Sequence, residues 1–386
     1  MQFTIPHYYH RFKCIADACS DTCCAGWEIM IDDDSIRQYK NQTGLLGQQF
    51  RNRINWKHGS FKQKQGRCAF LMENNLCELY LEGGPSMLCK TCREYPRHTE
   101  EFKGVRERSL SMSCEEAANL ILGLREPVRF LTKEDGREEV YPEFDSFLYK
   151  KLTSVREVLF FLLQNRDWSI GLRASMALGL GHDLQRRIQE GTLCQVDDLL
   201  KQYQLPTCSE AIQKKRKALQ GSDSLRYEIM KDWFSLFNQL EVISEDWPDY
   251  IEDLKDILFE KGEELYRKNR SNFNHDINGS EERKRTWDQW REQLLIYFIY
   301  TYFCGAVYDE QPYVKVKMAV VCTMLIEELA LGVYLKNGGS LSLSEFAGLA
   351  HKVSREIEHS DHNLSTLEIN FRTDGAYGIK RILRVL

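Results

Sequence analysis

At 386 residues, the chain has room for two or three domains, and its apolar content of 42% is enough for ordinary globular cores. The net charge is −5, with +3 in residues 1–114 and −8 in the remainder, so neither part has the basic stripe of a nucleic-acid-binding protein. No stretch approaches the ~20 uninterrupted apolar residues of a membrane span; the nearest, 294–304, predicts a buried helix, which leaves peripheral membrane association through its aromatic surface open.

The N-terminal third is predicted to be irregular. Apolar positions alternate over residues 25–31, which predicts a short strand, and Asp32 then supplies a capping oxygen for a helix that runs to about Trp56. Several turns follow, and Tyr95-Pro96 disfavours a helix at that point. A lobe built from turns and short elements has a small apolar core, so a bound metal centre could contribute part of its folding free energy.

From about Ser113 onward, apolar residues recur at three- and four-residue spacing, which predicts helices. Residues 268–285 are polar and predict an exposed linker that could subdivide this part. The expected fold is mainly α, with an irregular Cys-rich metal- or cluster-binding lobe over residues 1–114 packed on an all-helical body over residues 115–386. The predicted helices are 115–124, 144–163, 170–190, 225–240, 250–268, 287–303, 314–336 and 342–359.

Eight of the thirteen cysteines fall in two short clusters within the first quarter of the chain. Buried free cysteines behave as small apolar residues and scatter along a sequence, whereas thiolates that bind a metal or an iron–sulfur cluster come from closely spaced positions. The spacing therefore predicts a metal centre, and eight thiolates could hold two zinc ions or one four-iron cluster with four cysteines left over. Cys114 is a ninth candidate outside the clusters. The eight clustered candidates are Cys14, Cys19, Cys23, Cys24, Cys68, Cys77, Cys89 and Cys92.

Disulfide bonds and core packing account less well for the clustered cysteines. A disulfide framework needs an export signal, and residues 1–7 lack the basic and apolar regions of one. The chain is also too large to need covalent cross-links for its stability. Packing in an apolar core suits only the isolated cysteines, which are Cys194, Cys208, Cys304 and Cys322.

Two familiar cofactor motifs are missing from the sequence. After Cys19 and Cys23, the third position of the Cys-x3-Cys-x2-Cys motif of radical enzymes is Gly26. Residues 179–181 read Gly-Leu-Gly, but no strand precedes them and the surrounding pattern predicts a helix. No Rossmann-type dehydrogenase or methyltransferase domain is therefore predicted.

Four charged residues are candidates for binding or catalysis. Arg93 and Arg97, beside the last cysteine, could bind a carboxylate bidentately or offset the charge of a cluster; alternatively they are surface residues paired with local acids. Near the C-terminus, Glu358 or His359 could accept the proton that an attacking amine must lose. The alternative is an ordinary helix end, with His359 near the C-terminal carbonyls.

Together these segments resemble the flagellin lysine-N-methylase family of enteric bacteria, and the resemblance spans nearly the whole chain. The Cys-rich part by itself also resembles a wider group of small proteins that chelate zinc or iron. The segments that carry the resemblance are His7-Tyr8-Tyr9, Phe12-Lys13-Cys14, Cys19-Ser20-Asp21-Thr22-Cys23-Cys24-Ala25-Gly26-Trp27, Ile29-Met30-Ile31-Asp32, Cys68-Ala69-Phe70-Leu71, Leu76-Cys77-Glu78-Leu79-Tyr80, Leu88-Cys89-Lys90-Thr91-Cys92-Arg93-Glu94-Tyr95-Pro96-Arg97, Arg108-Ser109-Leu110-Ser111-Met112-Ser113-Cys114 and Arg355-Glu356-Ile357-Glu358-His359-Ser360.

The resemblance implies a cytoplasmic enzyme that uses S-adenosylmethionine to methylate lysine ε-amines of flagellin before export. It also implies a four-iron, four-sulfur (4Fe-4S) cluster held by the Cys-rich region, with the eight clustered cysteines as the candidate ligand set. No residue position for S-adenosylmethionine follows from it. We expect the cluster to take part in catalysis, because a helical body of this size should not need it merely to fold.

Two further functions stay open from the residues alone. A zinc-stabilised, non-enzymatic binding or adaptor protein would need only the cysteines and a helical surface. A metal-trafficking or redox protein could use Cys89 and Cys92 as its exchanging pair. Colour separates the first of these from an iron–sulfur enzyme, because zinc proteins are colourless.

Overall fold

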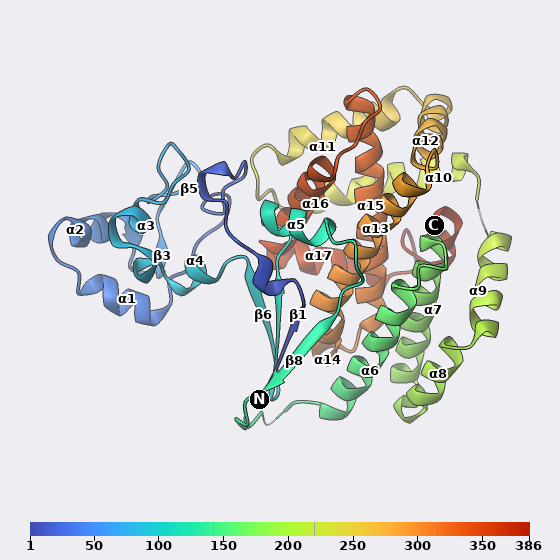
Figure 1. Cartoon of the computed structure of the whole chain (residues 1–386), viewed down its shortest axis with the longest axis horizontal. Helices are drawn as coiled ribbons and strands as arrows, with labels where there is room; N and C mark the ends of the chain where they lie inside the picture. The colour runs from blue at the N-terminus through green and yellow to red at the C-terminus, as the bar shows by residue number, and fades with distance from the viewer. Residues whose placement is uncertain (142, 220) are drawn as a thin grey trace.

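The computed structural model of the chain describes residues 1–141, 143–219 and 221–386. It shows a mainly helical protein, as predicted, in which a small N-terminal lobe projects from one side of a larger helical body (Figure 1). A four-stranded sheet lies along the side of the body that faces the lobe, and the chain passes through this sheet on its way into the lobe and out again.

The sheet was not predicted from the sequence. Its strand order is β6-β7-β1-β8; β1 (Gln2–Pro6) is parallel to β7 (Val105–Leu110) and antiparallel to β8 (Phe130–Glu134), and β6 (Arg97–Phe102) is antiparallel to β7. β6 and β7 are rich in charged residues, so they lack the apolar alternation by which a half-buried strand is recognised. The predicted domain boundary at residue 114 remains a prediction, and strands from both sides of it meet in this sheet.

The lobe has a small core of its own, separate from that of the body. The rings of Tyr39 and Phe50 stack with centroids 4.2 Å apart, and Phe61 and Phe70 pack around them. The secondary structure around this core is short throughout: α1 (Asp33–Lys40), α2 (Gly44–Arg53), β2 (Ile54–Asn55), β3 (Ser60–Phe61), β4 (Gln63–Lys64), β5 (Arg67–Cys68), α3 (Glu78–Gly83), η3 (Pro85–Met87) and α4 (Lys90–Glu94).

Two predictions for the lobe are wrong. Residues 25–31 form no strand but only isolated bridges at Ala25 and Met30, because Gly26 turns the chain with a φ of +84°. The helix predicted to run to Trp56 is interrupted before Gly44, although Asp32 caps its start as expected by accepting from the Ser35 N–H at 3.0 Å. α4 ends at Glu94, just before Tyr95-Pro96, as predicted.

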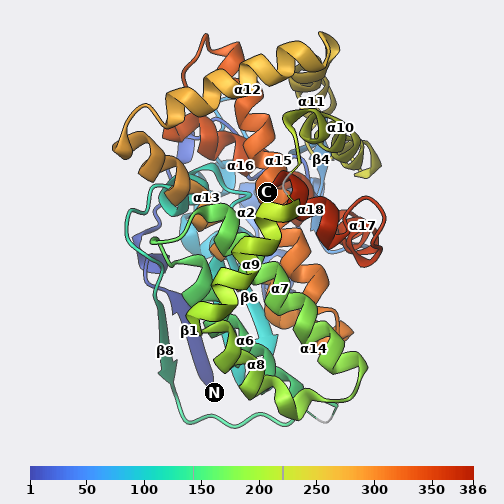
Figure 2. The same cartoon turned by 90° about the vertical axis from the view of Figure 1, so that its right-hand side faces the viewer.

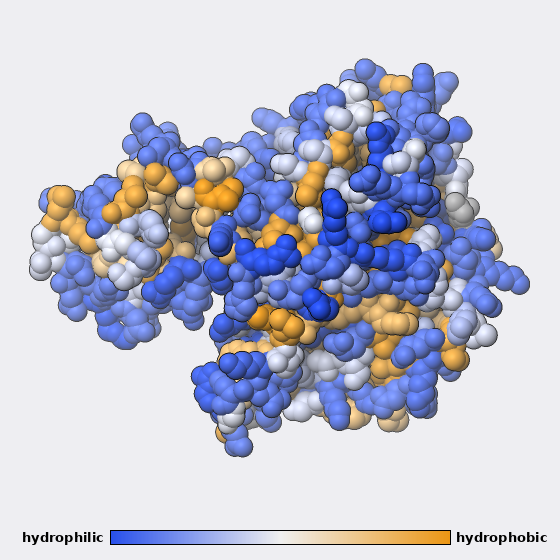
Figure 3. Space-filling view, in the orientation of Figure 1, coloured by the Kyte–Doolittle hydropathy of each residue, from blue (hydrophilic) through white to orange (hydrophobic). Residues whose placement is uncertain are grey.

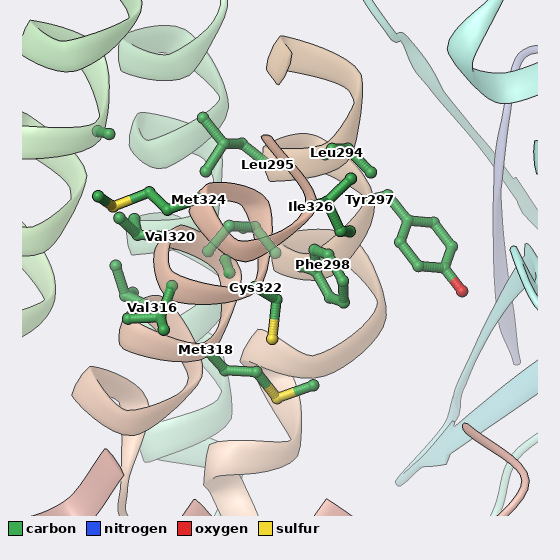
Figure 4. Close-up of a cluster of buried hydrophobic side chains, with 14 of the residues drawn as sticks. Leu294, Leu295, Tyr297, Phe298, Val316, Met318, Val320, Cys322, Met324 and Ile326 are labelled. Atoms are coloured by element: carbon green, nitrogen blue, oxygen red, sulfur yellow. The ribbon is translucent and has the colours of Figure 1, made fainter. Parts of the chain in front are cut away.

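The body is centred on α13 (Glu281–Tyr302) and α15 (Pro312–Lys336), whose apolar side chains interlock (Figure 4). Tyr297 extends from α13 away from this cluster, toward the sheet. α15 is long and apolar enough to cross a membrane, with a mean hydropathy of 1.8, but 78% of that stretch is buried inside the protein, as in the central helix of a globular core. The aromatic residues near the end of α13 are mostly buried too, as predicted for a buried helix.

The prediction of an exposed linker at residues 268–285 is wrong, because most of this segment is helical. α12 (Glu263–Ile277) covers its first half, and Ser280 caps the start of α13. The segment is polar because only one narrow face of α12 is covered; Tyr266 and Phe273, seven residues apart, form that face and are buried.

Helices around α13 and α15 complete the body, and Figure 2 shows several of them on its outer side. The Gly-x-Gly sequence lies inside α7 (Ile170–Gln189), as predicted. A Cβ on Gly181 would stand 2.9 Å from a methyl group of Val316, so this glycine lets α7 and α15 approach closely. The other body helices are α5 (Glu115–Leu122), α6 (Ser146–Leu163), α7 (Ile170–Gln189), α8 (Val196–Tyr203), α9 (Pro206–Leu219), α10 (Asp223–Trp233), α11 (Trp247–Lys255), α14 (Ala306–Asp309), α16 (Leu343–Glu358), α17 (Asp361–Arg372) and α18 (Ile379–Val385).

Candidate functional site

All thirteen cysteines are free thiols. Cys68 and Cys89 are buried in the core of the lobe, whereas Cys14 is exposed in the loop that leaves β1. The two sequence clusters come close together, because the Cys68 N–H donates to the Cys24 carbonyl at 2.8 Å.

The first group of thiols gathers beside the start of α5. It consists of Cys14, Cys19, Cys23 and Cys114. Burial and the neighbouring charges of Glu115 and Cys114 raise the pKa of Cys19 to about 11. A hydrogen bond with Cys24 and burial raise the pKa of Cys23, and the thiols of Cys114 and Cys14 act in the same direction. Cys114, which lies outside both sequence clusters, therefore belongs to this group.

The second group lies within the lobe. Cys89 and Cys92 share a hydrogen bond, which lowers the pKa of Cys89 and raises that of Cys92. Cys24 is near Cys68, Cys77 and Cys92, and its pKa falls to about 7 because it accepts a hydrogen bond from Cys23. The adjacent residues Cys23 and Cys24 thus connect the two groups.

The donor chemistry of these nine thiols fits zinc or an iron–sulfur cluster, since both are held by thiolates. Over residues 1–141, 143–219 and 221–386, however, no three His, Cys, Asp or Glu side chains are placed so that they could hold one metal ion. Ligation would therefore require the thiols of a group to converge further. The structure brings the predicted ligands close together but does not show which of them bind a metal.

The first cysteine loop is fixed to α16 by Asp21. Its carboxylate forms an ion pair with Arg355, whose Nη1 lies 2.7 Å from Oδ1, and pairs with His351 Nε2 at 2.8 Å. Burial alone would raise the pKa of Asp21, but the hydrogen bond from His351 and the charge of Arg355 outweigh it and hold the pKa low. Arg355 is only 2% exposed and also donates to the Thr22 carbonyl at 3.3 Å and to the Ala25 carbonyl. This ion pair joins residues more than 300 positions apart.

Two more contacts hold the same loop. Glu115, at the start of α5, accepts from the Ser20 N–H at 3.0 Å, the Ser20 hydroxyl at 2.8 Å and the Cys19 thiol at 3.6 Å. A Cβ on Gly26 would stand 3.0 Å from the Ile243 carbonyl and 3.1 Å from Arg355 Nη2, so the chain can pass there only as glycine. The cysteine loop is thus clamped between α5 and α16.

Glu358 lies at the end of α16, within the same region. Its carboxylate accepts hydrogen bonds from the Tyr297 and Ser111 hydroxyls. Burial raises the pKa of Glu358, while these two hydrogen bonds oppose that shift. A carboxylate with a raised pKa is a stronger base than an exposed one, as proton removal requires.

His359 packs against two aromatic rings, Trp27 at 4.9 Å and Tyr95 at 5.8 Å between centroids. Burial lowers the pKa of His359 to about 3, so the ring is neutral near pH 7 and only weakly basic. Its Nδ1 atom has no hydrogen-bond partner within the described part of the chain. The Trp27 indole donates to the Cys23 carbonyl at 2.8 Å, so the rings connect His359 to the first thiol group.

The structure does not join the two predicted arginines to this region. Arg97 is exposed, and its guanidinium lies over the rings of Phe12 at 5.4 Å and Tyr9 at 5.9 Å. Arg93 is exposed at the end of α4 and makes no ion pair with any other described residue. Their role in cofactor binding stays a prediction.

Sequence reasoning missed several members of this site, among them Asp21, Arg355 and Tyr297. Asp21 and Arg355 lie inside the segments that carried the family resemblance, which was the one available signal. Tyr297 gave none, because it reads as one more apolar residue in the pattern of α13.

Comparison with known proteins agrees with the family resemblance seen in the sequence. A family model described as the FliB lysine N-methylase C-terminal domain matches residues 156–385. Over 128 residues, the chain is 31% identical to the lysine-N-methylase of Salmonella typhimurium, a stretch that covers 31% of this chain and 32% of that protein. It is also 31% identical over 128 residues to the flagellar biosynthetic protein FliU of Salmonella muenchen, covering 76% of that protein. The match thus spans about a third of the length of the lysine-N-methylase. No solved structure matches the chain.

Proposed function

The chain belongs to the family defined by the FliB lysine N-methylase C-terminal domain, and from that premise we propose that it is a protein-lysine methyltransferase acting on flagellin in the cytoplasm. The observation that carries the proposal is the family match over residues 156–385, which covers more than half of the chain and most of the helical body. The flagellar name of the FliU relative supports flagellin as the substrate.

We propose S-adenosylmethionine as the methyl donor. In the reaction, the lone pair of the neutral lysine Nζ forms a bond to the sulfonium methyl carbon. The carbon–sulfur bond breaks with its electron pair going to sulfur, which leaves the neutral thioether S-adenosylhomocysteine. The methylated nitrogen then loses a proton to a base. The enzyme must present the amine in its neutral form and in line with the carbon–sulfur bond.

We propose Glu358 as that base. Its half-buried carboxylate has a raised pKa, which supports the assignment, whereas the pKa of about 3 makes the neighbouring His359 a poor base. Tyr297 and Ser111 hold the Glu358 carboxylate in place through their hydroxyl groups. His359 would then serve as a packing partner of Trp27 and Tyr95.

We further propose that the thiols of the lobe hold a four-iron, four-sulfur cluster that is needed for activity, with zinc as the alternative metal. The gathering of nine free thiols into two adjacent groups supports this assignment. When bound, such a cluster would supply iron that can act as a Lewis acid or an electron carrier. The clamp on the first cysteine loop would position that loop against α5 and α16.

The test is anaerobic purification followed by a visible spectrum, an iron and sulfide assay, and methyl transfer from S-adenosylmethionine to flagellin. We expect a brown protein that methylates flagellin and loses activity together with its iron. Cys23→Ser should lower the iron content, whereas Cys194→Ser, a change at an exposed and isolated cysteine, should not.

Other outcomes would each remove a different part of the proposal. A folded, metal-free protein with full activity would refute the role of the cluster and leave the methyltransferase in place. A colourless, zinc-loaded protein that transfers no methyl group would refute the enzyme and favour a zinc-stabilised adaptor.

A further inference from the structure

A cavity of about 560 Å³ opens between the sheet and α6, and none of the cysteines lines it. Its volume is in the range of sites that bind small organic molecules, about 300–1,000 Å³. The strands β1, β7 and β8 form one wall, and α6 forms the other. The site described above uses none of the side chains that line this cavity.

Arg156 and Glu107 form the floor of the cavity and neutralise each other. Arg156 Nη1 donates to Glu107 Oε2 at 2.5 Å, and each side chain is 5% exposed. Arg156 Nη1 also lies 3.5 Å from the Tyr300 carbonyl oxygen, whereas its Nε–H has no partner within the described residues. The floor therefore suits an uncharged part of a ligand.

Two charges of opposite sign line the same cavity nearer solvent. Arg129, just before β8, and Glu157, on α6, are both exposed and line the cavity. Neither forms an ion pair with any other residue that the structure describes. An unpaired cation and an unpaired anion at one opening complement the carboxylate and the ammonium group of a zwitterionic amino acid.

Aromatic rings make up much of the remaining wall. Phe130 stacks between Tyr300 and Phe160, with centroids 4.4 Å and 4.5 Å away. Phe161 also lines the cavity and is 55% exposed, which is unusual for a ring of this size. A flat heteroaromatic base could stack on Phe161 and remove it from water.

We infer that this cavity binds an amino-acid-bearing nucleoside of the S-adenosylmethionine class, with Arg129 and Glu157 holding the amino-acid end and Phe161 holding the base. The inference rests on the proposed function, because a methyltransferase needs a donor site and the sequence assigned none. β7 carries Glu107 at the floor and continues to Ser111, four residues on and about 13 Å farther along an extended chain, where Ser111 donates a hydrogen bond to Glu358.

Titration calorimetry on the full chain, purified anaerobically, tests the inference with two probes. S-adenosylhomocysteine carries both the base and the amino-acid end, whereas adenosine lacks the amino-acid end. We expect Arg129→Gln and Glu157→Gln each to weaken S-adenosylhomocysteine binding about tenfold and to leave adenosine binding unchanged. We expect Phe161→Ala to weaken both ligands about fivefold or more, because a base–aromatic stack contributes to each.

The matched controls are Arg186→Gln on α7 and Glu210→Gln on α9, which remove the same charges from exposed positions outside the cavity. Both should bind the two ligands as the unmodified protein does. If the unmodified protein binds S-adenosylhomocysteine and the three cavity variants bind it equally well, the donor site lies elsewhere, although the proposed function stands. If the unmodified protein binds neither S-adenosylhomocysteine nor S-adenosylmethionine, the proposed function itself fails.

Discussion

The body and the lobe differ in how much of their structure is held by apolar packing. The body buries an extensive set of apolar side chains around α13 and α15, whereas the core of the lobe is limited to a few residues around Tyr39 and Phe50. The lobe is also where the free thiols gather and where charged contacts fix the cysteine loop to α5 and α16. Figure 3 shows apolar side chains exposed in patches on both the lobe and the body, among mostly hydrophilic ones.

This difference indicates separate structural roles for the body and the lobe. A large core should make the body stable without a bound metal, so we expect it to act as a rigid support for a site at its edge. The lobe has less apolar area with which to offset the entropy of ordering its loops, so a bound metal would contribute more to its stability. Four predictions test this division.

The largest effect is expected from Glu328→Ala inside the body. Glu328 is fully buried and accepts from Arg226 Nη2 at 3.0 Å and from Arg270 Nη1 at 3.2 Å. Removing it leaves two cations without their anion, which should lower the free energy of unfolding by about 3–5 kcal/mol. Denaturant unfolding followed by far-UV circular dichroism measures the change.

The control for this variant is its chain neighbour. Glu327 is 13% exposed and has a 3.5 Å pair with Arg291, so Glu327→Ala should cost less than about 1 kcal/mol. Equal losses in the two variants would contradict the view that buried ion pairs, in addition to the apolar core, hold the body together.

A pH-dependent loss of stability is expected where the lobe meets the body. The pKa of His359 is lowered to about 3 from an ordinary value near 6.5, so the folded state disfavours protonation. Its contribution is therefore complete above pH 6.5 and is lost as the pH falls toward 3. Between pH 7 and pH 4 we expect a loss of about 2–3 kcal/mol from this group.

His359→Phe tests that expectation, because it keeps a ring between Trp27 and Tyr95 and removes the titrating group. Unfolding free energies measured from pH 4 to pH 7 should vary less in this variant by about that amount. His182→Gln, at an exposed histidine on α7, should keep the pH dependence of the unmodified protein. An unchanged pH dependence in His359→Phe would show that the imidazole is not enclosed.

A smaller effect is expected from Asp21→Asn, which removes the charge that pairs with Arg355 and His351. Asp21 is 29% exposed, so solvent screens part of the loss, and we expect a cost of about 2 kcal/mol. Hydrogen exchange should show faster exchange in residues 14–26 and unchanged protection in α13 and α15. Asp17→Asn, at an exposed position in the same loop, should leave exchange as it was. Loosening of the whole body would mean that lobe and body form one cooperative unit.

The sequence predicted much of the body but little of the lobe and none of the sheet. Helices such as α16 follow from apolar periodicity, because one side is covered by its neighbours, whereas α15 is apolar and buried on nearly every side. The sheet could not be found in this way, since β1 pairs with strands about 100 residues away and β6 and β7 are highly charged. The polar sequence of α12 predicts a linker because only one narrow face of this helix is buried.

The sequence predicted individual residues of the candidate site but not which of them lie together in the folded chain. Cysteine spacing identified the eight clustered thiols, but only the folded chain places Cys114 beside Cys14, Cys19 and Cys23. The ion pair between Asp21 and Arg355 depends on the packing of α16 against the cysteine loop, which no local pattern encodes. The cavity beside α6 likewise requires the sheet, so its residues gave no signal in the sequence.

The smallest effect on stability is expected from Tyr297→Phe, where the core of the body meets the proposed base. The Tyr297 hydroxyl donates to Glu358 and accepts from the Met112 N–H at 3.0 Å. Loss of this hydroxyl should lower the free energy of unfolding by about 1 kcal/mol, because most of the ring packing remains. The hydrogen bond from Tyr297 lowers the pKa of Glu358, so its removal raises that pKa further.

Because a base must be deprotonated to act, the ascending limb of the methyl-transfer pH profile should move to higher pH in Tyr297→Phe. Tyr308→Phe is the matched control, since the Tyr308 hydroxyl donates to the Glu101 carbonyl at 2.7 Å on the surface, far along the chain from Glu358. It should shift neither stability nor the pH profile. A Tyr297→Phe enzyme that loses stability but keeps its pH profile would show that Glu358 is a structural group of the body and not the base.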